Sequence, residues 1–205
     1  MNMPNTQNVK LSENIILADA DYIDLVTFRL SVQFERMVGR RIPKADLSRW
    51  AVDIALDGGL REDSKPHETQ LVLLHDKSKK QLDNFSPSAY DTELNAQAFR
   101  DDKLGEFLVN AYPTGSMVAK DDYLQDAIRT ILEHDEVRRL MIIPNGEEGE
   151  SYDLVSHALH DAPDDKRITV FAMQPMPGGN FRQEILGYSL MNALGIKADE
   201  LKTED

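Results

Sequence analysis

Two patterns of apolar residues alternate along the chain, and together they predict a series of strands and helices. Residues 14–19 form a short apolar run that ends in an acid, which is typical of a buried strand. In the next segment apolar residues recur three and four positions apart, as on one face of a helix: Ile23, Val26, Leu30, Phe34 and Met37. Gly39 is placed to end that helix.

A second amphipathic helix is predicted to begin at Pro43 and to end at Gly58 and Gly59. Its apolar face consists of Leu47, Trp50, Ala51 and Ile54. We expect the two helices to form a hairpin over the sheet.

The middle of the chain predicts further strands. Residues 70–75 read as a second strand, and the polar residues 76–79 followed by 81–85 indicate an antiparallel return. Ser88 and Asp91 give a partial helix-start signal. Residues 107–112 predict another main strand, which Pro113 ends.

From Asp121 onward helices and strands alternate regularly. One helix precedes a strand at residues 140–144, and a second helix precedes a strand at 168–173. The spacing of Phe181, Ile185, Tyr188 and Leu194 predicts a final helix that Gly195 caps.

This alternation indicates the α/β class, with a three-layer, Rossmann-like arrangement of a mostly parallel sheet, helices on both faces and one antiparallel hairpin element. We expect a single domain over residues 14–196. Residues 1–13 are expected to be a flexible N-terminal segment and residues 197–205 a flexible tail.

Composition excludes several classes of partner and site. The 205 residues are 41% hydrophobic, and 23 basic against 36 acidic residues give a net charge of −13, which disfavours nucleic acid as a partner unless a metal mediates. The absence of cysteine excludes disulfides and thiolate sites. The chain shows neither a secretory start nor an apolar run near the ~20 residues of a membrane span, so we expect a cytoplasmic protein without a membrane partner.

Carboxylates collect where predicted strands end, and this is where open α/β sheets bind ligands. Those candidates are Asp19, Asp21, Asp122, Asp126, Glu147 and Glu148. Converging carboxylates need a hard cation such as Mg²⁺ or Mn²⁺. Acids also stabilise helix N-termini by charge–dipole attraction, which explains Asp121, Asp122, Glu150 and Asp153 without a metal.

The order of these elements resembles the PIN and NYN family of metal-dependent RNases. The members carry an Asp after the first strand, acids on a later helix and an acidic loop after a later strand; the matching residues here are Asp19, Asp122, Asp126 and Glu147 or Glu148. The family's Ser-Gly-Asp-x-Asp-Phe loop is replaced by residues 144–149, and Tyr22 and Ile23 stand where the family has an Asn. The resemblance therefore implies a degenerate, non-catalytic relative.

Two functions follow from these observations. The first is a domain without catalysis or cofactor that binds a protein partner or assembles with itself. The alternative is a Mg²⁺- or Mn²⁺-dependent nuclease or phosphohydrolase, in which Asp19, Asp126 and Glu147 hold the metal that activates water. The alternative requires at least three carboxylates within ~2–2.6 Å of one point.

Three weaker signals have ordinary explanations beside the functional ones. Asp19-Ala20-Asp21 resembles the start of a haloacid-dehalogenase-type phosphatase, but no later Gly-Asp-x-x-x-Asp follows. His157 and His160 have metal-ligand spacing, yet they lie in the acidic stretch 145–165, which is typical of a solvated face. Residues 176–180 have the composition of an anion cradle beside Arg182, but a hinge or turn is the use that we favour.

One basic patch lies between the first two predicted helices: Arg36, Arg40, Arg41, Lys44 and Arg49. It either binds an acidic partner, including the stretch 145–165 of another copy, or is a solvated helix end. We favour the solvated helix end, since charge clusters are usually solvated.

Overall fold

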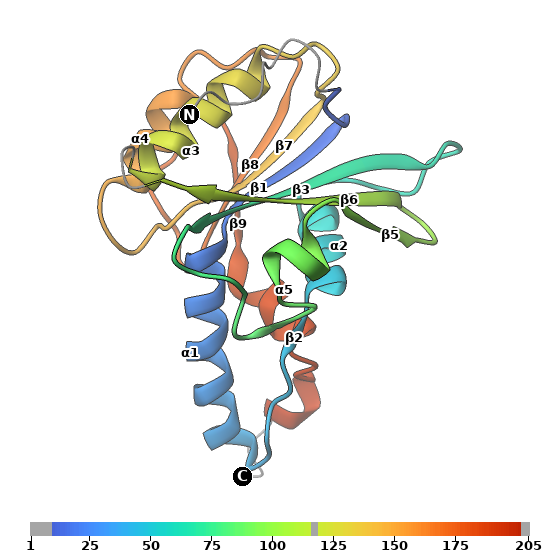
Figure 1. Ribbon diagram of the computed structural model, residues 1–205, viewed down its shortest axis with the longest axis vertical. Coiled ribbons are helices and arrows are strands. Elements are labelled where there is room, and N and C mark those ends of the chain that lie inside the picture. Colours follow the sequence, from blue (N-terminus) through green and yellow to red (C-terminus); the bar gives the residue numbers. More distant parts are fainter. Residues whose placement is uncertain (1–9, 116–118, 202–205) are drawn as a thin grey trace.

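The computed structural model describes residues 10–115 and 119–201 and has a seven-stranded sheet at its centre (Figure 1). The strand order is β5-β6-β3-β1-β7-β8-β9, and every neighbouring pair is parallel except β5 and β6. The strands are β1 (Asn14–Asp19), β3 (His67–Asp76), β5 (Gln97–Asp101), β6 (Gly105–Thr114), β7 (Arg139–Ile143), β8 (Arg167–Ala172) and β9 (Arg182–Ile185). The predicted α/β class with a mostly parallel sheet is confirmed.

Helices cover both faces of this sheet (Figure 1). They are α1 (Ala20–Val38), α2 (Leu47–Asp57), α3 (Lys120–Leu132), α4 (Ser151–Ala158) and α5 (Leu186–Ala193). Along β1, Ile16 and Ala18 pack into the core shared with α1, α2 and α5, whereas Ile15 and Leu17 pack against α3 and α4. The continuous apolar run of β1 thus reflects burial on two sides.

Local capping chemistry sets the ends of the first two helices. The side chain of Asp19 accepts a hydrogen bond from the amide of Tyr22 at the start of α1, and Gly39 ends the helix in the left-handed region with φ of 66°. α2 begins at Leu47 rather than at Pro43, because the Asp46 side chain caps it through the amide of Arg49.

The antiparallel pair of strands is not formed by residues 81–85, as the sequence predicted, but by β5 and β6. Residues 81–85 do not return along β3; instead β4 (Phe85–Ser86) pairs in parallel with β2 (Ala45–Asp46) in a separate two-stranded sheet. Leu82 and Phe85 are fully buried in the core, which holds this segment under the main sheet. The antiparallel pair is β5 with β6, joined by a turn at Gly105, where φ is 96°.

Two predicted helices also differ from the structure. The helix expected within residues 86–99 is a single π-helical turn, Tyr90–Leu94. The final helix begins at Leu186, because residues 182–185 extend as β9 along the edge of β8. The pairing of an edge strand overrides the helical spacing that Phe181 and Ile185 share with α5.

The described part of the expected tail is structured. Ala198–Leu201 form a 3₁₀ helix that lies beside the far end of α1 (Figure 1). Among the helices of residues 10–115 and 119–201, none combines the length and the apolar character that a bilayer crossing requires. Residues 1–9 of the predicted N-terminal segment lie outside the described residues.

Trp50 provides a test of the packing between α2 and the core. Its side chain is 0% exposed, and its ring meets Phe85 edge-on at a centroid distance of 5.8 Å. We expect Trp50→Ala to lower the free energy of unfolding by about 3–5 kcal/mol, through lost contacts and a residual cavity. Urea unfolding followed by circular dichroism measures this. Tyr188→Ala, at a side chain that is 71% exposed, should change it by about 0.5 kcal/mol or less.

Candidate functional site

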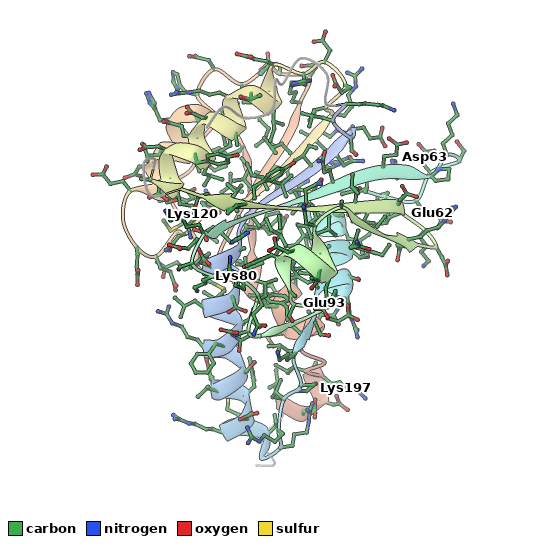
Figure 2. All side chains as sticks on the ribbon, viewed as in Figure 1. Glu62, Asp63, Lys80, Glu93, Lys120 and Lys197 are labelled. Atoms are coloured by element: carbon green, nitrogen blue, oxygen red, sulfur yellow. The ribbon has the colours of Figure 1, made fainter. Side chains whose placement is uncertain are left out.

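Two of the predicted carboxylates meet at the C-terminal edge of the sheet, where the end of β1 becomes the first turn of α1. Asp19 and Asp21 both contact Lys120, the first residue of α3. The Lys120 Nζ lies 2.7 Å from Asp19 Oδ1 and 2.7 Å from Asp21 Oδ2. Figure 2 shows Lys120 close to the start of α1. An ammonium group therefore bridges the two acids.

The second acid is also tied to the end of β3. Asp21 Oδ2 accepts a hydrogen bond of 2.9 Å from the amide of Asp76, and Asp21 Oδ1 lies 3.5 Å from the Nζ of Lys79. Three segments far apart in the sequence thus converge on one carboxylate.

Burial of this cluster shifts the pKa values of its charged groups. Asp19 is 3% exposed, and burial raises the pKa of its carboxyl, although Lys120 and the Tyr22 amide oppose the rise. Burial pulls the pKa of Lys120 down, but its contacts with the two carboxylates outweigh that and leave it above the ordinary value. The amine stays protonated and supplies the positive charge that the acids need.

Two tyrosines complete the surroundings. The hydroxyls of Tyr22 and Tyr90 are buried and have no hydrogen-bond partner among the described residues. Burial raises the pKa of both phenols, with Glu147 adding to the effect at Tyr22 and Asp21 at Tyr90, so both stay neutral. The Tyr90 ring stacks on His75 at a centroid distance of 3.7 Å.

The other predicted metal ligands lie apart from this cluster. Asp122 is exposed on α3, and Asp126 lies 3.8 Å from Arg129 in an exposed pair. Glu147 forms a 2.9 Å ion pair with Arg29.

Glu148 is exposed in a loop that the Asn145 side chain organises by accepting bonds from the amides of Glu147 and Glu148. No group of three or more acidic or histidine side chains within residues 10–115 and 119–201 is arranged to hold a metal ion.

The donor set at Asp19 and Asp21 does not fit a divalent cation as the protein stands. Mg²⁺ and Mn²⁺ need several oxygens directed at one point. Here the oxygens that face each other already accept the Lys120 ammonium.

Sequence reasoning missed Lys120, because a single lysine before the acids of a helix N-terminus carries no pattern of its own.

The basic patch is used in part within the chain. The Arg40 guanidinium donates to both carboxylate oxygens of Glu200, from Nε to Oε1 at 2.7 Å and from Nη2 to Oε2 at 2.9 Å. These bonds are the main reason that the pKa of Glu200 falls to about 2. Arg49 donates to Asn192 at 2.7 Å, and Arg41 lies 3.9 Å from Glu35. Arg36 and Lys44 are exposed. The patch thus helps to fasten the C-terminal segment to the end of α1.

Fold and site define a mostly parallel α/β protein whose buried carboxylate pair is bridged by an internal lysine. The chain belongs to the family of unknown function DUF6621, whose model matches residues 8–201. No curated protein and no solved structure matches the chain.

The lysine bridge gives a stability prediction. Lys120→Met deprives the buried Asp19 carboxylate of its ion-pair partner and should lower the free energy of unfolding by about 3 kcal/mol at neutral pH. Lys79→Met, at an exposed amine farther from Asp21, is the matched control and should cost about 1 kcal/mol or less.

The loss should also depend on pH. Because the pKa of Asp19 is raised in the folded protein, folding favours the protonated acid, and that contribution is lost as pH rises through the folded pKa. The penalty of Lys120→Met should therefore be larger at about pH 8 than at about pH 5. Urea unfolding at the two pH values measures it, and an equal penalty at both would show that Lys120 acts by packing alone.

Proposed function

We propose that this chain is a Rossmann-like, PIN/NYN-like domain that acts by binding a protein partner, a second copy included, and not by catalysis. The observation that carries the proposal is the position of the Lys120 ammonium, 2.7 Å from both Asp19 and Asp21. A fixed protein cation stands where a metal-dependent nuclease would need an exchangeable one.

The order of the strands supports the Rossmann-like part of the proposal. The chain enters the sheet at its centre with β1, adds β3 and β6 on one side, and then adds β7, β8 and β9 on the other. Six parallel strands in this order are typical of doubly wound dinucleotide-binding folds, in which the reversal beside the first strand marks the ligand crevice. Asp19 ends β1 beside this reversal of strand order, and this position supports the PIN/NYN-like part of the proposal.

The exposed side of α1 supports the binding part of the proposal. Of the five large hydrophobic side chains that are exposed among the described residues, three lie on this helix: Leu25, Phe28 and Met37. Phe28 is 52% exposed, and the next residue, Arg29, joins α1 to the loop after β7 through its ion pair with Glu147. Leu25 and Phe28 are three residues apart and share one face of the helix, and neighbouring exposed apolar side chains favour a protein interface over a solvated surface.

Thermal unfolding with divalent metal tests the absence of catalysis. The midpoint of the wild type in millimolar Mn²⁺ should equal its value in EDTA, because a metal would have to displace the Lys120 ammonium from both acids. Asp102→Asn, at an exposed acid in the turn between β5 and β6, controls for weak surface binding.

A rise of the wild-type midpoint that Asp19→Asn abolishes and Asp102→Asn preserves would contradict the proposal. Binding to the folded state alone raises stability by ~2.7 kcal/mol at a hundredfold excess over the dissociation constant, which is easily seen. That result would favour the Mg²⁺- or Mn²⁺-dependent nuclease or phosphohydrolase.

Analytical ultracentrifugation tests the interface on α1. If the partner is a second copy, the wild type should associate as its concentration rises, and Phe28→Lys should abolish the association by placing a charge in the buried face. Gln33→Lys adds the same charge at an exposed position of the same helix and should leave association unchanged. A wild type that stays monomeric would exclude the second copy, and association that Phe28→Lys leaves intact would exclude this face.

A further inference from the structure

A second charged site lies at the opposite edge of the sheet, where β7, β8 and β9 begin. Arg139 and Arg167 are register partners on neighbouring strands, and Arg182 is the register partner of Thr169. Because side chains two residues apart on a strand share a face, all three arginines lie on the same face of the sheet. This is the face that carries Met141 and Phe171 into the core with α2 and α5.

These arginines line a pocket of about 440 Å³ below the C-terminal end of α2. Its cationic lining residues are Arg139, Lys166, Arg167 and Arg182, and no Asp or Glu is among the described residues that line it. Pockets of roughly 300–1,000 Å³ hold small-molecule ligands. A surface this basic stands out on a chain with a net charge of −13.

Arg139 is the buried member of the group. It is 8% exposed; its Nη1 donates to the carbonyl of Gly58 at 2.8 Å, whereas its Nε is buried without a hydrogen-bond partner among the described residues. Burial and the nearby Arg167, Arg61 and Arg182 lower the pKa of its guanidinium. A buried, incompletely satisfied cation among like charges is costly unless an anion joins it.

Gly59 lies beside two of the guanidinium groups. Its φ is 88°, and a Cβ at this position would lie 3.2 Å from Arg139 Nη1 and 3.5 Å from Arg182 Nη1. Both guanidinium groups thus lie beside Gly59, where the positive φ favours a glycine.

Protein groups offset only part of this charge. Arg182 pairs with Glu184 at 3.0 Å, Lys166 donates to two backbone carbonyls, and Glu13 lies near enough to Arg139 to oppose the fall of its pKa. The amide of Arg167 donates to the carbonyl of Arg138 at 2.9 Å, whereas its guanidinium forms no hydrogen bond or ion pair with the residues that the structure describes. Capping of the α2 C-terminus explains Arg139 and the ion pair with Glu184 offsets Arg182, but neither contact explains Arg167.

We propose that this pocket binds a small molecule through a phosphate or pyrophosphate group. Guanidinium groups from neighbouring strands offer paired N–H donors that match phosphate oxygens, and a multiply charged anion balances several cations at once. Asn180 and Phe181 also line the pocket and provide a polar and an aromatic contact for the rest of such a ligand. The anion-binding groups of this proposal are thus side chains at the starts of three strands, and not the backbone amides of residues 176–180.

Isothermal titration with inorganic pyrophosphate tests the site directly. The wild type should bind with a stoichiometry near one, and Arg167→Gln and Arg182→Gln should each weaken binding by roughly tenfold, since each removes charge-assisted hydrogen bonds. Both side chains are exposed, so both variants should fold. Arg100→Gln, an exposed arginine on β5 at the far edge of the same sheet, is the matched control and should bind as the wild type does.

Further arms separate specific binding from ionic screening and from the lysine-bridged site. Sodium chloride at matched ionic strength should not reproduce the effect of pyrophosphate, and Lys120→Met should bind pyrophosphate like the wild type. The proposal is overturned if no saturable binding occurs, or if Arg167→Gln and Arg182→Gln bind as tightly as Arg100→Gln. Citrate that binds as tightly as pyrophosphate would overturn the preference for phosphate.

Discussion

The rest of the structure depends on β1, a strand at the centre of the sheet that is buried on both faces and paired on both edges. It pairs with β3 on one side and β7 on the other, and its side chains enter both cores. β1 ends in Asp19, whose side chain caps α1 where the chain leaves the sheet. Because Asp19 remains buried there, its carboxylate needs a partner, and Lys120 fills that need from the start of α3.

The charges of the molecule are arranged differently at the two edges of the sheet. At the C-terminal edge, acids are neutralised from within the chain: Lys120 joins the pair near β1, and Arg29 pairs with Glu147. At the N-terminal edge, arginines of three neighbouring strands face one pocket with few acids to balance them. Internal neutralisation leaves little for a cation to bind, whereas unbalanced arginines favour an anion.

Much of the fold was readable from the sequence. Periodicity located α1 and Gly39 predicted its end, because helix-ending signals depend on neighbours within a few residues; the cap that Asp19 forms became clear only in the structure. The wrong predictions concern segments whose secondary structure is decided by pairing with strands far away in the sequence. Residues 182–185 were predicted as part of a helix, but they pair with β8 as strand β9. The hairpin strand predicted at residues 81–85 does not form, and Phe85 belongs instead to a separate two-stranded sheet. Edge strands and two-residue strands bury too little to leave a pattern.

By itself the sequence determined the α/β class, the central strand, the candidate acids at its end and the large negative charge, since these follow from local periodicity and composition. Only the tertiary structure decided which side chains those acids contact. Lys120 lies 99 residues from Asp21, and Arg139, Arg167 and Arg182 share a face only through strand register. Neither grouping has a sequence pattern, because the residues that form it are brought together by the order in which strands enter the sheet.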